Sequence, residues 1–149
     1  MRENANVQPI VRIRKTPDCS KWYGNGETAR IMGYIAETKN LVQLENDSDE
    51  IILSKRKCVH DYVELLYSYA KSACFGIYQR VLRDESLDKS RMTWGKVPRI
   101  YRERGVQIFK EMAALSNIHI DRSEDDWLPW LIMARRYHNK YNPKRRQVM

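Results

Sequence analysis

Basic side chains gather near the end of the sequence, where they could bind phosphate groups. Six of them fall within residues 135–146, and no acidic residue stands among them. Mobile cations on one accessible face are what contacts with a phosphate backbone require. Three more arginines earlier in the chain could extend this surface. The predicted nucleic-acid-binding residues are therefore Arg99, Arg102, Arg104, Arg135, Arg136, Lys140, Lys144, Arg145 and Arg146.

The net charge of +8 is distributed unevenly along the chain. Residues 86–149 carry 14 basic and 7 acidic side chains, whereas residues 1–60 carry 10 and 8, and residues 61–85 carry 3 and 4. Almost the whole excess of positive charge therefore belongs to the C-terminal part. Such an asymmetry indicates a polyanionic partner. The alternative is a solvated basic face that only keeps the protein in solution.

The sequence gives only indirect indications of which polyanion is bound. Nothing in the sequence indicates base-specific recognition, so we expect mainly contacts with the phosphate backbone. Duplex DNA is favoured over RNA, because the aromatic residues fall in helical stripes that predict burial rather than display for single-strand stacking. An accessory or regulatory factor in transcription or genome handling would fit. The rival hypothesis is a protein-interaction or assembly module, whose Trp-rich segment 127–141 would dock on a partner protein.

Motifs that carry catalysis are missing from the sequence, which has no Gly-rich phosphate loop, no G-x-S-x-G and no H-E-x-x-H. The acidic clusters at residues 47–50 and 124–126 could bind a divalent ion as a nuclease does. Each also has a structural explanation, the first as a turn and the second as a helix cap. We therefore predict a non-enzymatic protein with no catalytic residues, cofactor or metal, and keep a metal-dependent nuclease as a second alternative.

The elements that position these residues are organised around a helix predicted over residues 59–83. Its apolar residues recur at steps of three and four, which places them on one side. Asp61 would begin a capping box. Further apolar residues, Phe75 among them, widen the stripe and predict burial against several partners, and Gly76 could mark a close helix contact. The stripe itself consists of Val59, Tyr62, Val63, Leu66, Tyr69, Ala70, Ala73, Ile77, Tyr78 and Val81.

Two more helices are predicted after the central one. Pro98 suits the first turn of one of them, although Gly105 could break this helix in two. One face of this helix would carry the apolar residues Ile100, Tyr101, Ile108, Phe109, Met112 and Leu115. Ser123 and the acidic residues 124–126 would open the other, where the helix dipole favours negative charge. Pro143 would end that last helix and leave a flexible basic tail.

The N-terminal part of the chain is predicted to form short strands. Strand-like runs at residues 7–15, 28–36, 41–45 and 50–54 are separated by loop or turn residues. Residues 26–54, with the runs G-E-T-A-R-I-M-G-Y, L-V-Q-L and E-I-I-L, resemble the small SH3-like barrels of the KOW and Tudor type. The resemblance implies a module that often docks nucleic acid or a protein tail.

Together these patterns predict an α+β protein, with a small antiparallel β-module over residues 1–58 and a basic domain of about three helices over residues 59–149. The first residues lack the apolar core of a signal peptide, and no apolar run approaches the ~20 residues of a membrane helix. The three cysteines are an odd number without a C-x-x-C pair, which fits a reducing compartment. We therefore expect an intracellular protein with no membrane segment and no disulfide.

Overall fold

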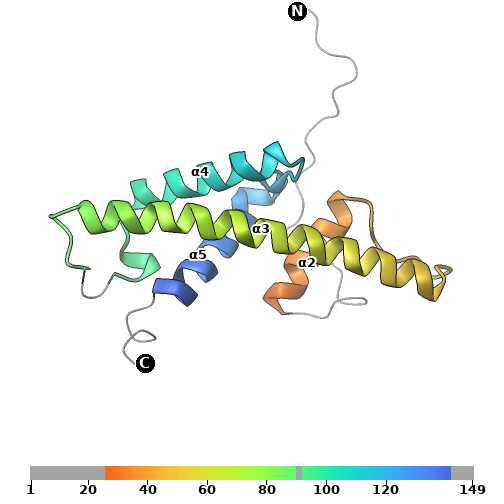
Figure 1. The fold of residues 1–149 in the computed structure, drawn as a ribbon. Coiled ribbons are helices and arrows are strands. Elements are labelled where there is room, and N and C mark those ends of the chain that lie inside the picture. Colours follow the sequence, from red (N-terminus) through yellow and green to blue (C-terminus); the bar gives the residue numbers. More distant parts are fainter. Residues whose placement is uncertain (1–25, 90–91, 142–149) are drawn as a thin grey trace, which may run out of the picture.

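A computed structural model describes residues 26–89 and 92–141 (Figure 1). Helices α4 and α5 both pack on the long helix α3, and α2 packs on the N-terminal half of α3. Short 3₁₀ turns join the later helices. The helices are α2 (Glu27–Thr38), α3 (Asp49–Arg83), α4 (Arg99–Leu115) and α5 (Trp127–Tyr141), and the turns are η2 (Trp94–Lys96), η3 (Ile120–Arg122) and η4 (Glu124–Asp126).

The predicted β-module is wrong, because the described residues contain helices and no strand. Residues 28–36 belong to α2, residues 41–45 form a connection without regular structure, and residues 50–54 are the first turns of α3. The physical reason lies in the spacing: Ile31, Tyr34 and Ile35 are buried at helical steps of three and four. The α+β class and the SH3-like resemblance are therefore both incorrect. The run at residues 7–15 lies outside the described residues.

Helix α3 is longer than predicted. Its cap is Ser48, whose Oγ accepts a hydrogen bond from the backbone N–H of Ile51 at 3.3 Å, so Asp61 lies inside the helix instead of capping it. The predicted stripe is confirmed over residues 59–83, where its buried positions are Val59, Val63, Leu66, Ala70, Ala73, Ile77 and Val81. These residues join α2, α4 and α5 in one hydrophobic core, and residue 58, the predicted end of the first domain, lies within α3. The wider burial predicted through Phe75 is wrong, because 52 % of this residue is exposed.

Gly105 brings the backbone of α4 directly against the Ile77 side chain of α3. A Cβ atom at Gly105 would lie 2.3 Å from Cδ1 of Ile77, which is closer than packed atoms come, so the two helices meet there because the side chain is missing. Helix α4 continues unbroken through this glycine. Gly76, by contrast, is exposed and has open space around its Cβ position, so the close contact predicted for it is wrong.

The start of α5 is organised by a buried serine. Ser123 Oγ donates a hydrogen bond to the carbonyl of Ile120 at 3.0 Å and accepts one from the backbone N–H of Leu128 at 3.3 Å. Asp125 and Asp126 have positive φ angles of 54° and 56°, so a tight turn precedes the helix. Helix α5 then buries one apolar face in the core. The buried residues are Trp127, Leu128, Pro129, Ile132, Met133, Tyr137 and Tyr141.

Candidate nucleic-acid interface

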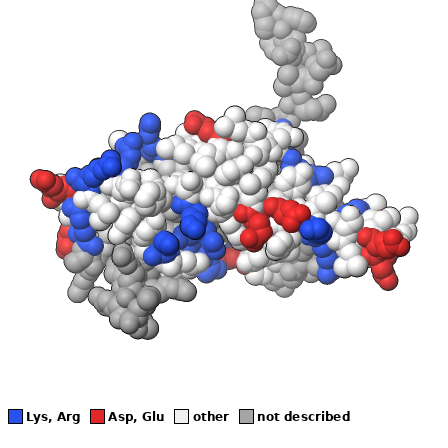
Figure 2. Space-filling model, viewed as in Figure 1, with Lys and Arg blue, Asp and Glu red and all other residues white. Residues whose placement is uncertain are grey.

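Lys and Arg side chains gather below the middle of α3, over the ribbon of α5 (Figure 2). Two hollows meet there. One has a volume of about 600 Å³ and the other of about 240 Å³, and both are lined by Lys71, Lys140 and Tyr141. Because they share these side chains, we treat them as one feature, the α3–α5 groove. Its remaining lining residues are Ser68, Ser72, Cys74, Phe75, Tyr78, Arg136 and Asn139.

Local helical spacing explains why these residues share the groove. Lys71, Phe75 and Tyr78 stand four and three positions apart on α3, and Arg136 and Lys140 stand four apart on α5, so each set occupies one face of its helix. The packing of α5 on α3 then turns the two faces towards the same hollow. Neither Lys71 nor Phe75 was among the predicted site residues. The available signal was Lys71 itself, one turn before Phe75, because it is the only charged residue between Glu64 and Arg80.

Three aromatic residues line the groove and are called its aromatic wall: Phe75, Tyr78 and Tyr141. The rings of Tyr78 and Tyr141 are stacked, with centroids 4.1 Å apart and planes 15° from parallel, and Tyr137 lies 4.9 Å from Tyr141. Phe75 is different, because 52 % of it is exposed. The wall therefore contains a fixed tyrosine pair and one open aromatic face.

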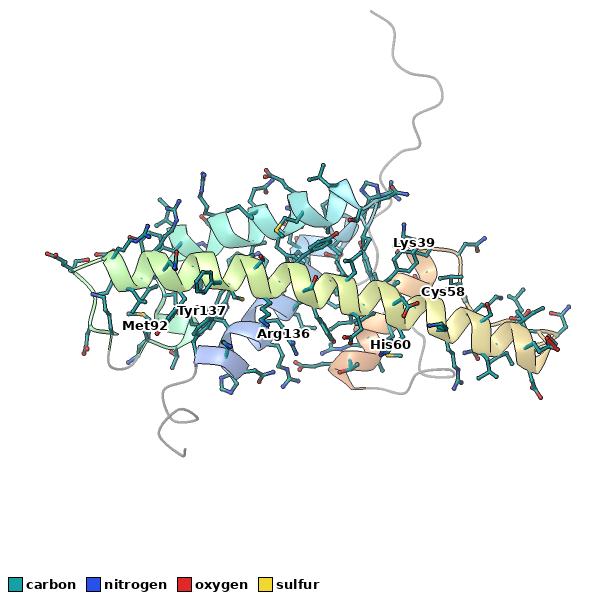
Figure 3. All side chains as sticks on the ribbon, in the orientation of Figure 1. Lys39, Cys58, His60, Met92, Arg136 and Tyr137 are labelled. Atoms are coloured by element: carbon teal, nitrogen blue, oxygen red, sulfur yellow. The ribbon has the colours of Figure 1, made fainter. Side chains whose placement is uncertain are left out.

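Arg136 lies between the ribbons of α3 and α5 (Figure 3). Its guanidinium carbon is 4.5 Å from the ring centroid of Tyr67, an arrangement typical of a cation–π contact. Its Nε is buried and has no hydrogen-bond partner within the described chain. Burial raises the pKa of the neighbouring Cys74 thiol to about 12, and the charge of Arg136 only partly opposes this shift. Cys74 therefore stays a neutral thiol at pH 7 and supplies no negative charge beside Arg136.

The other cations predicted near the C-terminus do not line the α3–α5 groove within the described residues. Arg135 forms an ion pair with Glu27, which links α5 to the first turn of α2. It also lines a third hollow of about 170 Å³, together with Arg136. Lys144, Arg145 and Arg146, and with them the predicted flexible tail, lie outside the described residues. The structure therefore brings Arg136 and Lys140 together in the groove and gives Arg135 a carboxylate partner.

The predicted cations of α4 have neighbours of their own. Arg99 Nε donates to Oε2 of Glu103 at 2.7 Å. Arg102 Nε donates to the carbonyl of Val97 at 3.0 Å, and its guanidinium carbon is 5.9 Å from the ring centroids of both Trp94 and Trp130. Arg104 is exposed. Arg102 therefore contributes to packing around these tryptophans, which gives it a structural role.

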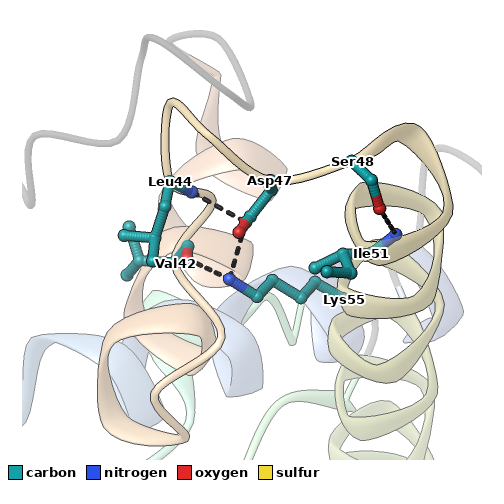
Figure 4. A network of polar contacts seen from close by, with 6 residues as sticks. All are labelled: Val42, Leu44, Asp47, Ser48, Ile51 and Lys55. Carbon is teal, nitrogen blue, oxygen red and sulfur yellow. Dashed lines mark hydrogen bonds and ion pairs between the residues drawn. The ribbon is translucent and has the colours of Figure 1, made fainter.

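The two acidic clusters also make internal contacts. Oδ2 of Asp47 accepts hydrogen bonds from the Lys55 ammonium at 2.7 Å and from the Leu44 backbone N–H at 2.9 Å (Figure 4). The hydrogen bond from Lys55, and after it the one from Leu44, hold the pKa of Asp47 below its usual range. Oδ2 of Asp126 forms an ion pair with Lys110 at 2.9 Å. The described residues contain no group of three or more His, Cys, Asp or Glu side chains that could hold a metal ion.

Comparisons with protein-family models, with curated proteins and with solved structures found no match. Among the described helices, none combines the length and the apolar character needed to cross a membrane.

Proposed function

We propose that this protein binds nucleic acid without catalysing a reaction, through phosphate contacts in the α3–α5 groove. The observation that carries the proposal is the convergence of Lys71, Arg136 and Lys140 from two helices on one groove whose lining contains no Asp or Glu. Cations that share a groove attract a polyanion and release its counterions on binding. An intracellular role as an accessory factor in transcription or genome handling agrees with this chemistry.

The rival proposal, a protein-interaction module using the tryptophans of α5, has less support. Trp127 is buried and packs edge-on against Tyr34, with ring centroids 6.0 Å apart. Trp130 packs in the same way against Trp94, also at 6.0 Å. These rings already have partners within the fold, so an interface on α5 would have to use other side chains.

Measuring nucleic-acid affinity against salt concentration tests the phosphate contacts. In the double variant Lys71→Gln/Lys140→Gln, the slope of log K against log salt should fall by roughly 0.7–0.9 for each phosphate that is no longer neutralised. The matched control is Arg56→Gln/Lys57→Gln, which removes the same charge from exposed positions of α3 about 20 Å or more from Lys71 along the helix axis. The control should keep most of the slope. An equal decrease in both variants would show that only net charge matters, and the groove would have no specific role.

A further inference from the structure

Phe75 is an exposed aromatic side chain inside a cationic hollow. It lies one helical turn after Lys71, and both line the hollow of about 600 Å³ together with Lys140. A single exposed apolar residue needs no explanation by itself. Here, however, the open ring lies beside two ammonium groups that have no carboxylate among their lining neighbours. The flat apolar ring suits the base of a nucleotide, and the adjacent cations suit its phosphate.

The other rings of the wall are less available for stacking. Tyr78 and Tyr141 each have one face covered by the other, and Tyr141 is only 9 % exposed. Phe75 is 52 % exposed, so its ring is the most accessible aromatic surface in the groove lining. A volume of about 600 Å³ lies within the range of roughly 300–1,000 Å³ typical of small-ligand sites.

We infer that the groove takes an unpaired nucleotide of a single strand, with its base stacked on Phe75 and its flanking phosphates on Lys71 and Lys140. This inference rests on the proposed function, and it changes the preference for duplex DNA that the sequence indicated. In a duplex, the base faces are covered by neighbouring bases, so only an unpaired or extruded base could reach Phe75. Every base has a stacking face, so binding should tolerate different sequences.

The test measures binding of the full chain by fluorescence anisotropy. The probes are a labelled single-stranded oligothymidine, the same strand with an abasic stretch, and a duplex of equal length. Phe75→Ala should weaken oligothymidine binding about 5- to 100-fold and leave the salt slope unchanged. It should have little effect on the abasic strand or the duplex. Leu82→Ala, which truncates another exposed apolar residue of α3, is the control and should bind as the unchanged protein does.

The outcomes separate this inference from the proposed function. If Phe75→Ala binds oligothymidine as the unchanged protein does, while Lys71→Gln/Lys140→Gln has a lower salt slope, stacking is refuted and phosphate binding stands. Equal weakening on oligothymidine and on the abasic strand would also refute stacking. If none of the three probes binds, both proposals fail. Restored oligothymidine affinity in Phe75→Trp would support stacking, since tryptophan keeps a flat ring at that position.

Discussion

The two faces of α3 differ in what surrounds them. The buried face carries Leu66, Ala70 and Ile77, each at most 2 % exposed, and it meets the apolar residues of the other helices. The groove face carries Lys71 and Phe75, which are exposed. Side chains on adjacent positions, such as Ala70 and Lys71, therefore have different environments. One helix can therefore contribute to stability through one side and to the proposed binding surface through the other, so mutations should separate the two properties.

The largest expected effect is on the buried face. Leu66→Ala should lower the free energy of unfolding by about 2–5 kcal/mol, because it leaves a cavity in the core. Phe75→Ala removes a larger side chain from the groove face but should cost less than about 1 kcal/mol, because half of it already contacts water. Urea denaturation of both variants measures the difference. Decreases of similar size in the free energy of unfolding would show that the two faces of α3 contribute equally to stability.

Two glycines give the second test. Gly105→Ala should lower the free energy of unfolding by about 1–2 kcal/mol, because its Cβ would overlap the buried Ile77 side chain and overpacking outweighs the gain in helix propensity. Gly76→Ala adds the same methyl group where there is open space, and should stabilise by roughly 0.4–1 kcal/mol. The two thermal melting temperatures should therefore shift in opposite directions. If both melting temperatures shift in the same direction, the Ile77 side chain moves aside to accommodate the new methyl group at position 105.

The smallest expected effect concerns the polar contacts before α3. The pKa of Asp47 is lowered in the folded protein by its bond to Lys55, so the carboxylate form stabilises the fold above the ordinary carboxyl pKa. That contribution is lost as the pH falls from the ordinary carboxyl pKa through the lowered folded pKa. Asp47→Asn should therefore have a slightly lower melting temperature than the unchanged protein at pH 7, and this difference should be smaller at pH 3. A difference that does not depend on pH would show that the charge of Asp47 is not involved.

Helical periodicity was a reliable guide where the apolar pattern was long. The stripe from Val59 to Val81 was predictable because its spacing repeats over many turns. In α4 the pattern misled: Ile100 and Leu115, predicted for its apolar face, are 70 % and 90 % exposed, while Val106 and Ala113 are buried. Apolar residues occur on more than one side of this helix, so composition alone could not select the face that meets α3.

The short N-terminal helix shows a different limit. The apolar residues of α2 fit strand alternation over a few positions and helical spacing over the full element. Its conformation is supported by distant partners: the Tyr34 hydroxyl donates a hydrogen bond to the His119 carbonyl at 2.5 Å, and its ring packs against Trp127. Those partners are far away in the sequence, so no local pattern could indicate them.

The helical register of α3 and the concentration of positive charge in residues 86–149 could be read from the sequence alone, because both depend only on residue type and spacing. Which cations share a surface was decided by the tertiary structure. Lys71 and Lys140 belong to different helices and line one groove only because α5 packs on α3. Arg102 belongs to the same basic region, yet the fold places it beside Trp94 and Trp130. The physical reason is that spacing fixes the face within one helix, whereas packing fixes which faces meet.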